Sequence, residues 1–462
     1  MKINLLKNWD RLRTSFWFVP VIMATSSVAM SFVSVALDRT VVQEWANAPE
    51  WIYAGGAEGA SSVLETIAGS MITVAGVVFS LTLVALSMAA SQFGPRLLRN
   101  FMRDTMNQIV LGTFVATFLF CLLVLRTIRY DGDGAFVPHL SVTLGVLFAV
   151  ASLGVLIYFI HHVAVSVQVD EIVTRVSVDL MHGVESLFPE QIGEGTDAGR
   201  RRDSLLPDGF GERACAVVAP KDGYLQLVDA DALMKFAQES DVVVKIERRP
   251  GDYVVAGTVL ASAWPGQKID RELEQRIVSV FVIDQVRTTV QDIEFAVEQL
   301  VEIAVRALSP GVNNPFTAIS CIDRLGAALC RLAQREMPPP CRHDEQGRLR
   351  VMAPASSFAE IADAAFNPIR EYARTSTVVT RRLLQTLAIV GQFARRSDDR
   401  QAVRRLAESI LRGSCALAEE NDRRAVEADY RQALEGLQRI QPGVAAAPGE
   451  IASRTTTDGV GS

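Results

Sequence analysis

The chain has 462 residues, with 46 Lys and Arg against 52 Asp and Glu, which gives a net charge of −6. Such a chain is too long for one hydrophobic core, so two or three domains are expected. A mildly acidic chain argues against nucleic acid as a main partner, because phosphate binding needs a dense basic face. The mean hydropathy is +0.21 although 21% of the residues are charged, which indicates an apolar part joined to an ordinary soluble part.

Four apolar stretches in the first third of the chain are long enough to cross a bilayer, which takes about 20 helical residues. The only Asp, Glu, Lys or Arg within them is Glu65. The first stretch is too long to be the apolar region of a cleaved signal peptide. With their loops these stretches form a membrane domain over residues 1–162. The predicted spans are 15–37, 63–90, 108–125 and 138–160.

Positive charge near the ends of the spans predicts their orientation. Seven Lys and Arg residues precede the first span or lie between the second and third, whereas the opposite loops carry only three. The loop after the first span is otherwise acidic and includes Asp38. Because the positive loops are the cytoplasmic ones, we expect both termini in the cytoplasm and the protein in the inner membrane of a bacterial cell. The seven are Lys2, Lys7, Arg11, Arg13, Arg96, Arg99 and Arg103.

The second span carries a stripe of small or hydroxylated residues. Its members are separated by four, three, four, seven and four positions, which places all of them on one helical face. Such a face lets helices approach closely, and its hydroxyls can bond across the contact. In an oligomer the same face could line a water-filled path, so helix packing and pore lining both remain open. The stripe consists of Gly69, Thr73, Gly76, Ser80, Ser87 and Ser91.

Two features follow the second and fourth spans on the predicted cytoplasmic side. Gly94-Pro95 ends the second span, and residues 96–103 combine apolar side chains with three arginines. This composition fits a short amphipathic helix in the interface or an ordinary basic loop. After the fourth span, apolar residues continue at helical spacing, so we expect a helical stalk and a linker over residues 163–212.

A β-rich module is predicted over residues 213–265, with a short helix at 231–240 between its strands. The turns Pro220–Gly223 and Pro250-Gly251-Asp252 resemble those of the barrel-sandwich fold of biotinyl and lipoyl carriers. A carrier function is not expected, because Lys235 lies in the predicted helix and not at a hairpin tip. The segments with strand composition are 214–219, 224–228, 242–246 and 253–261.

Residues 266–440 are predicted to form a helical domain. Residues 284–308 place apolar side chains on one stripe and charged ones opposite, as in a helix that packs on a core. Residues 337–355 include three successive prolines and are expected to form an exposed loop. Two or three more helices follow from Ser357 to about Arg439, the first of them kinked or divided at Asn367-Pro368. The tail, 441–462, is small, polar and expected to be disordered.

The segment Ser309–Thr317 joins two of these predicted helices. Asn314 before Pro315 suits an N-cap followed by the first helical residue, so a well-made interhelical turn explains the segment. The alternative is a small polar site, in which free amides at a helix start hold an anion or a partner's carboxylate. The candidate residues of that site are Arg287, Gln291, Asp292, Asn313, Asn314 and Thr317.

Three groups of residues carry a family resemblance: 73–80 with 91–96, Arg287-Thr288 with Gln291-Asp292, and 306–311 with 313–318. With them the chain resembles a bacterial family of predicted membrane proteins known as domain of unknown function 2254. The resemblance extends from the first span to about Tyr372 and implies an integral membrane protein, with no established activity. The usual family pattern has Asp at the position of Asn314, so a carboxylate that a metal or acid role would need is missing here.

The sequence thus predicts an α-helical integral membrane protein with four transmembrane helices and a cytoplasmic α+β domain. In that domain a small barrel-sandwich-like β module precedes a helical bundle. The sequence has no P-loop, G-x-S-x-G, H-E-x-x-H or kinase motif, so an enzyme is not expected. The six cysteines form no Cys-x-x-Cys pair and there are only five histidines, so neither a metal nor a cofactor is expected.

Two functions remain open. One is an oligomeric, channel-like protein whose cytoplasmic domain regulates it. The other is a membrane-anchored sensor or scaffold that binds a ligand or protein partner through that domain. Spans without internal charge argue against coupled transport. The expected partners are the lipid bilayer, further copies of the chain, and a cytoplasmic protein or small anionic ligand.

Overall fold

The structure is a computed structural model, which describes residues 17–40, 56–93, 105–130, 136–166, 168–188, 206–354 and 356–438. The chain divides into two compact units, Met1–Ile172 and Val173–Ser462. Each of four helices in the first unit is long and apolar enough to cross a membrane, which agrees with the four predicted spans. They are α2 (Phe18–Thr40), α3 (Ala57–Phe93), α5 (Thr105–Leu125) and α6 (His139–Ser166).

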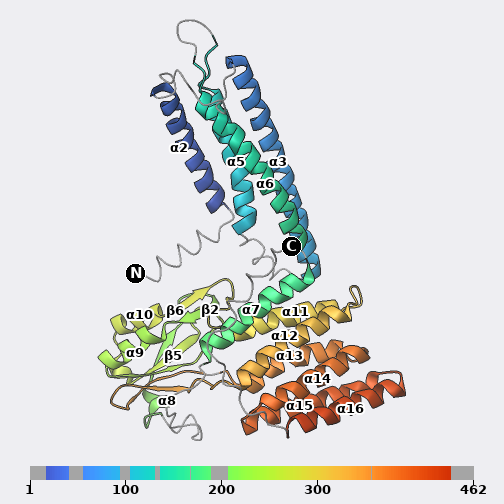
Figure 1. Cartoon of the computed structure of the whole chain (residues 1–462). Coiled ribbons are helices and arrows are strands. Elements are labelled where there is room, and N and C mark those ends of the chain that lie inside the picture. Colours follow the sequence, from blue (N-terminus) through green and yellow to red (C-terminus); the bar gives the residue numbers. More distant parts are fainter. Residues whose placement is uncertain are drawn as a thin grey trace, which may run out of the picture. The chain divides into compact units, whose positions relative to one another are not determined.

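Helix α5 is the central element of the first unit, since it packs against α2, α3 and α6 (Figure 1). Half of its apolar window is buried, compared with 17% of that of α3. One core cluster is built around Leu64 and Phe120, and a second around Val78, Phe114 and Phe159. The apolar side chains on the outer faces of these helices suit a lipid surrounding, in which only the backbone must be satisfied internally.

A buried carboxylate joins two of the membrane helices. The sequence placed Asp38 in an acidic loop, but α2 continues to Thr40 and leaves Asp38 only 2% exposed. Its oxygens accept hydrogen bonds from the backbone N–H of Leu140 at 2.8 Å and of Ser141 at 2.9 Å, and from the Ser141 hydroxyl at 2.6 Å. These backbone groups lie in the first turn of α6 and have no acceptor within their own helix. Asp38 therefore caps α6 from another helix, and the expectation that Asp38 lies in the loop after the first span was wrong.

Helix α7 (Val169–Leu187) begins three residues after the last residue of α6, so the structure has two helices where one continuous stalk was predicted. Its apolar face is buried within the second unit, where Leu180 and Val184 lie beside Ile293 and Leu329. The buried guanidinium of Arg335 donates to the carbonyl oxygens of Glu185 and Phe188 at its end, which satisfies acceptors that a helix leaves free. The greater part of α7 is thus an integral helix of the second unit.

The β module has two sheets, one of five strands in the order β1-β5-β3-β8-β7 and one of three in the order β4-β2-β6. All pairs are antiparallel except β3 with β8. Its short helices are α8 (Phe210–Arg213), α9 (Ala230–Glu239), η3 (Gly266–Lys268) and α10 (Arg271–Ser279). The strands are β1 (Cys215–Val218), β2 (Gly223–Val228), β3 (Val243–Ile246), β4 (Tyr253–Val254), β5 (Val259–Trp264), β6 (Phe281–Asp284), β7 (Cys341–His343) and β8 (Leu349–Met352). Strands are present in all four segments predicted at 214–261, but the last of them, 253–261, is divided into β4 and β5 by a turn at residues 255–258. A barrel-sandwich arrangement stays a prediction.

Two predictions about the region after residue 265 were wrong. Residues 337–355 are not an exposed loop, because β7 and β8 form a hairpin that joins the larger sheet through β3. Buried Arg350 holds this hairpin, with Asp344 and Asp241 each at 2.8 Å. Residues 284–308 are not one helix, because β6 pairs with β2 and the helix begins only after Asp292. Val290 has helical spacing but is 60% exposed.

The rest of the second unit is helical. Helix α11 packs against α12 and α13, and α14 packs against α12, α15 and α16 (Figure 1). In the described part of the chain, four helices follow Ser357, more than the two or three predicted, and α13 continues through Pro368 without division. These elements are α11 (Ile293–Ala307), α12 (Pro315–Ala333), α13 (Phe358–Tyr372), α14 (Thr377–Phe393), α15 (Ser397–Gly413), η4 (Ser414–Ala416) and α16 (Glu420–Gly436).

The capping role of Asp38 predicts a clear effect on stability. Asp38→Ala should lower the free energy of unfolding by about 1–3 kcal/mol, because buried donors at the start of α6 lose their acceptor. Asp38→Asn should lose less, since its amide oxygen can still accept. Unfolding in detergent micelles, followed by circular dichroism, measures both. Thr40→Ala is the control, because the Thr40 hydroxyl is exposed and donates to the carbonyl of Ala36 in its own helix. Equal losses in Asp38→Ala and Thr40→Ala would contradict the capping role.

Candidate functional sites

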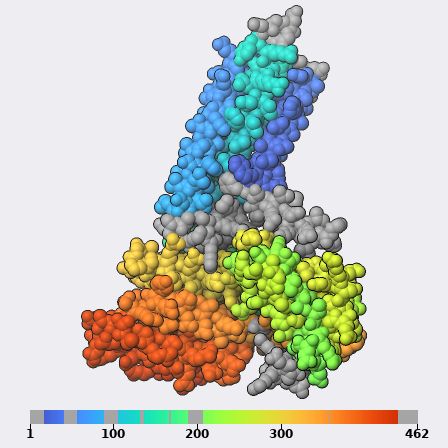
Figure 2. Space-filling view, turned by 180° about the vertical axis from the view of Figure 1, so that it is seen from behind, coloured from blue at the N-terminus to red at the C-terminus, as the bar shows by residue number. Residues whose placement is uncertain are grey.

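The small-residue stripe of α3 faces outward. Gly69, Thr73, Gly76, Ser80 and Ser87 are all exposed, and a methyl group added at either glycine would meet nothing within 4 Å. The side chain of Ser91 lies outside the described residues, as do Gly94-Pro95 and the predicted interfacial helix at 96–103. Figure 2 shows α3 along the outer edge of the helical bundle. No helix in the described part of the chain covers the stripe.

The chain's own helices pack on another face of α3. That buried face is built from Leu64, Ala68, Ala75 and Val78. At about 100° per residue, these positions lie on the opposite side of the helix from the stripe. Helix packing through the stripe therefore does not occur within the described chain. Packing between copies and pore lining both remain predictions.

The six residues of the predicted polar site fall into two groups. Arg287, Gln291 and Asp292 precede α11, whereas Asn313, Asn314 and Thr317 follow it. A helix of 15 residues is about 22 Å long at 1.5 Å per residue, so the two groups lie at opposite ends of α11. The structure does not bring them together as one site. Each group has its own surroundings, and a ligand for either stays a prediction.

The first group fastens the start of α11 to the β module. The side chain of Gln291 accepts a hydrogen bond from the backbone N–H of Val228 at 2.9 Å and donates one to its carbonyl at 3.2 Å. Asp292 is the N-cap of α11 and accepts from the backbone N–H of Phe295 at 3.0 Å. This pair of contacts fixes where the helix begins and binds it to strand β2. We call Arg287, Gln291 and Asp292 the α11 clamp.

Arg287 completes the clamp through charge. Its guanidinium lies 2.8 Å from Asp292 and 2.8 Å from Glu298, and it covers the ring of Phe295 at 5.1 Å. Burial opposes its charge, but the hydrogen bonds and charges of Asp292 and Glu298 outweigh this and raise the pKa of Arg287. All polar ends of the clamp are therefore engaged, and a structural role explains its residues.

The second group forms the turn that the sequence indicated. Asn314 is the N-cap of α12, its side chain accepts from the backbone N–H of Thr317 at 3.3 Å, and Pro315 opens the helix. Asn313 has a positive φ of 46°, which Asn tolerates better than most residues. Beside this rigid turn Phe316 is 75% exposed. The turn explains the polar residues. No residue in the described chain covers the ring of Phe316, and the turn does not explain why this ring is exposed.

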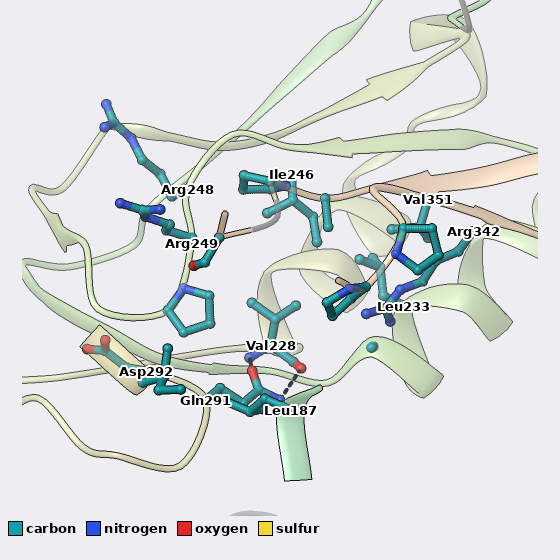
Figure 3. Close-up of a pocket in the computed structure, with 18 of the residues that line it drawn as sticks. Leu187, Val228, Leu233, Ile246, Arg248, Arg249, Gln291, Asp292, Arg342 and Val351 are labelled. Carbon is teal, nitrogen blue, oxygen red and sulfur yellow. Dashed lines mark hydrogen bonds between the residues drawn. The ribbon is translucent and has the colours of Figure 1, made fainter. Parts of the chain in front are cut away.

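A cavity of about 210 Å³ lies beside the clamp, and sequence reasoning did not foresee it. Figure 3 shows Gln291, Asp292 and Val228 on one wall, Arg248 and Arg249 on a second side, and Arg342 beside Val351 and Leu233. Arg249 forms ion pairs with Glu294 at 3.3 Å and Glu360 at 3.4 Å. In the sequence, the feature that could have indicated this cavity was the run of neighbouring lining residues Arg248-Arg249-Pro250. No group of three or more potential metal-ligating side chains occurs among the described residues.

Four candidate spans, a mixed α/β region and a helical bundle define a multi-pass membrane protein with a large second unit. A family model described as "Predicted membrane protein (DUF2254)" matches residues 13–389 of this chain. The chain belongs to that family, as its three motif segments indicated. No solved structure resembles the chain closely enough to count as a match.

Two similar proteins come from mycobacteria. The chain is 35% identical over 447 residues to the uncharacterized protein MT1328 of Mycobacterium tuberculosis (strain CDC 1551 / Oshkosh), which covers 95% of this chain and 83% of the relative. The uncharacterized protein Mb1321c of Mycobacterium bovis gives the same identity and the same coverage. These names attach no activity to the fold.

The clamp predicts different costs for two similar substitutions. Gly251 and Gly257 both have positive φ, 101° and 87°, so alanine strains the backbone at either position. Only at Gly251 would the added carbon meet a neighbour, the Asp292 carboxylate oxygen at 2.5 Å. Gly251→Ala should therefore destabilise the protein by about 1–3 kcal/mol more than Gly257→Ala, as measured by chemical denaturation. Equal costs would show that this turn does not constrain Asp292.

Proposed function

We propose that this protein is an oligomeric, channel-like protein of the bacterial inner membrane, with the second unit as its cytoplasmic regulatory domain and no enzymatic activity. The observation that supports the proposal is the outward stripe of α3. Gly69 and Gly76 offer an open surface to a neighbouring helix, and Ser80 and Ser87 present hydroxyl groups on the same exposed face. Leaving such a face to lipid gives up both close packing and hydrogen bonding.

Association through this face follows from how helices attract each other in lipid. Lipid tails are as apolar as leucine, so association depends on close van der Waals packing and hydrogen bonds. Glycine at positions 69 and 76 lets backbones approach, and the Thr73 hydroxyl already bonds to the Gly69 carbonyl at 2.8 Å, so it adds no unsatisfied group. In a ring of copies the same face would surround a path lined by small and hydroxylated residues.

Disrupting the stripe should separate the copies. Gly76→Leu and Ser80→Leu place bulk on the proposed contact, so the oligomer should dissociate in mild detergent, as measured by light scattering and native mass spectrometry. Val77→Leu is the matched control, because Val77 is 53% exposed on a neighbouring face and should leave the mass unchanged. A monomer in the wild-type protein would exclude a shared path.

The channel part of the proposal is tested on the same variants. The reconstituted wild-type protein should conduct ions across a planar bilayer, and Ser80→Leu should reduce or abolish the current while Val77→Leu retains it. If the oligomer forms but conducts no current under either voltage or membrane tension, the proposed association stands and the proposed channel is rejected.

The proposed orientation has its own test. A reporter that is active only in the periplasm, fused after Leu437, should be inactive, because the positive loops place the C-terminal side of the chain in the cytoplasm. The same reporter inserted after Arg129, between the third and fourth spans, should be active. The reverse pattern would invert the topology.

A second function, a membrane-anchored sensor or scaffold, is favoured by a different observation. The second unit contains a cavity with arginines at its edge, which neither the clamp nor the fold requires. A sensor of this kind would bind a small anionic ligand or a protein partner in the cytoplasm, with lipid and not nucleic acid as its other contact.

A further inference from the structure

The cavity beside the α11 clamp has the size and surface of a small-molecule site. Its volume of about 210 Å³ corresponds to roughly seven water molecules at about 30 Å³ each. Apolar side chains dominate its walls, with Leu187, Val228, Leu233, Ile246 and Val351 among them (Figure 3). Such walls favour an apolar body, because water gains little from contact with them. The volume is below the usual range for drug-sized ligands, about 300–1,000 Å³, which favours a small ligand.

Two arginines at this cavity have no charge partner within the described chain. The side chains of Arg248 and Arg342 are exposed, and their guanidinium groups form no hydrogen bond or ion pair with any residue that the structure describes, unlike that of Arg249, which Glu294 and Glu360 engage. Arg342 lies on β7 beside the apolar residues Leu233 and Val351 (Figure 3). A guanidinium presents a planar fork of donors that matches a carboxylate.

The start of α11 does not compete for such a ligand. Asp292 lines the cavity, but its carboxylate already caps the helix and pairs with Arg287. Burial raises the pKa of the other acid on this wall, Glu294, although Arg249 opposes the shift. The helix N-terminus is thus filled by the chain itself, and recognition of an anion falls to the arginine side chains.

We propose that this cavity binds a small organic carboxylate, with its apolar body between β2, α9 and β8 and its carboxylate on Arg342. This inference rests on the sensor function above and names its ligand class. A purely inorganic anion would leave the apolar walls unfilled, and a neutral hydrocarbon would leave Arg342 without a partner.

The site also touches an element that leads to the membrane. Leu187 and Phe188 line the cavity at the end of α7, and Arg335 holds that end through the carbonyl oxygens of Glu185 and Phe188. Helix α7 begins three residues after the end of α6 in the chain. A ligand that packs on Leu187 therefore contacts the helix that follows the fourth span directly.

The experiment uses the full-length protein in maltoside micelles, with benzoate as probe and benzamide as a neutral molecule of the same shape. Benzoate should raise the melting temperature progressively as its concentration increases to about 10 mM, in the range of a weak site, and benzamide should not. Titration calorimetry then gives the dissociation constant. Arg342→Gln should raise that constant at least about tenfold, a loss of one charge-assisted hydrogen-bonded pair, and Arg342→Lys should lie between the two.

Two further variants make the outcome decisive. Arg405→Gln removes an exposed arginine on α15, away from the cavity lining, and should leave binding unchanged. Ala353→Leu should fill the cavity and abolish binding with all arginines in place. Equal shifts with benzoate and benzamide, no shift with either, or unchanged affinity in Arg342→Gln would overturn the proposal. If benzoate fails but a protein partner is recovered from membranes, the scaffold function survives without this ligand.

Discussion

A backbone polar group in lipid must find its partner inside the protein, and the membrane unit depends on that constraint. The interior of a helix meets it alone, but the first turn leaves N–H groups without acceptors. At the start of α6 the acceptor comes from α2, as the carboxylate of Asp38. One buried side chain therefore completes a helix and fixes two spans to each other. The charge that ends α2 is a structural necessity of the neighbouring helix.

The need to satisfy polar groups within the protein also distinguishes two faces of α3. Both are rich in small residues, but the one that packs on α5 and α6 carries Ala68 and Ala75 among larger apolar side chains. The other combines glycine with hydroxyl groups and contacts nothing in the described chain. Alanine packs well on a fixed neighbour, whereas glycine and serine gain most where a second helix can approach or where water is present. This contrast is why the outward face carries the proposal for oligomeric function.

Sequence alone predicted what depends on short-range pattern. The four spans follow from length and apolarity, and Asn314-Pro315 from capping chemistry. It failed where the deciding partner is distant in the chain. Strand β8 pairs through Val351 with Val244 of β3, which no local composition reveals, and Gln291 ends the helical spacing of residues 284–308 by bonding to Val228. The cavity was missed for the same reason, since Arg248 and Arg342 come to line one cavity only once β3 and the β7–β8 hairpin share a sheet.

The arginines of the second unit separate structural from available charge. Arg287 was one of the six candidates from sequence, but its guanidinium is engaged by Asp292 and Glu298, and Arg350 is likewise held between Asp241 and Asp344. Removing a partner from such a pair would leave a buried charge, so these residues preserve the fold. Arg342 differs because the fold gains nothing visible from its charge. Arg342 lies beside an apolar cavity and its side chain has no partner in the described chain. No ion pair must therefore be broken before it binds an anion, which makes it the better candidate for recognition.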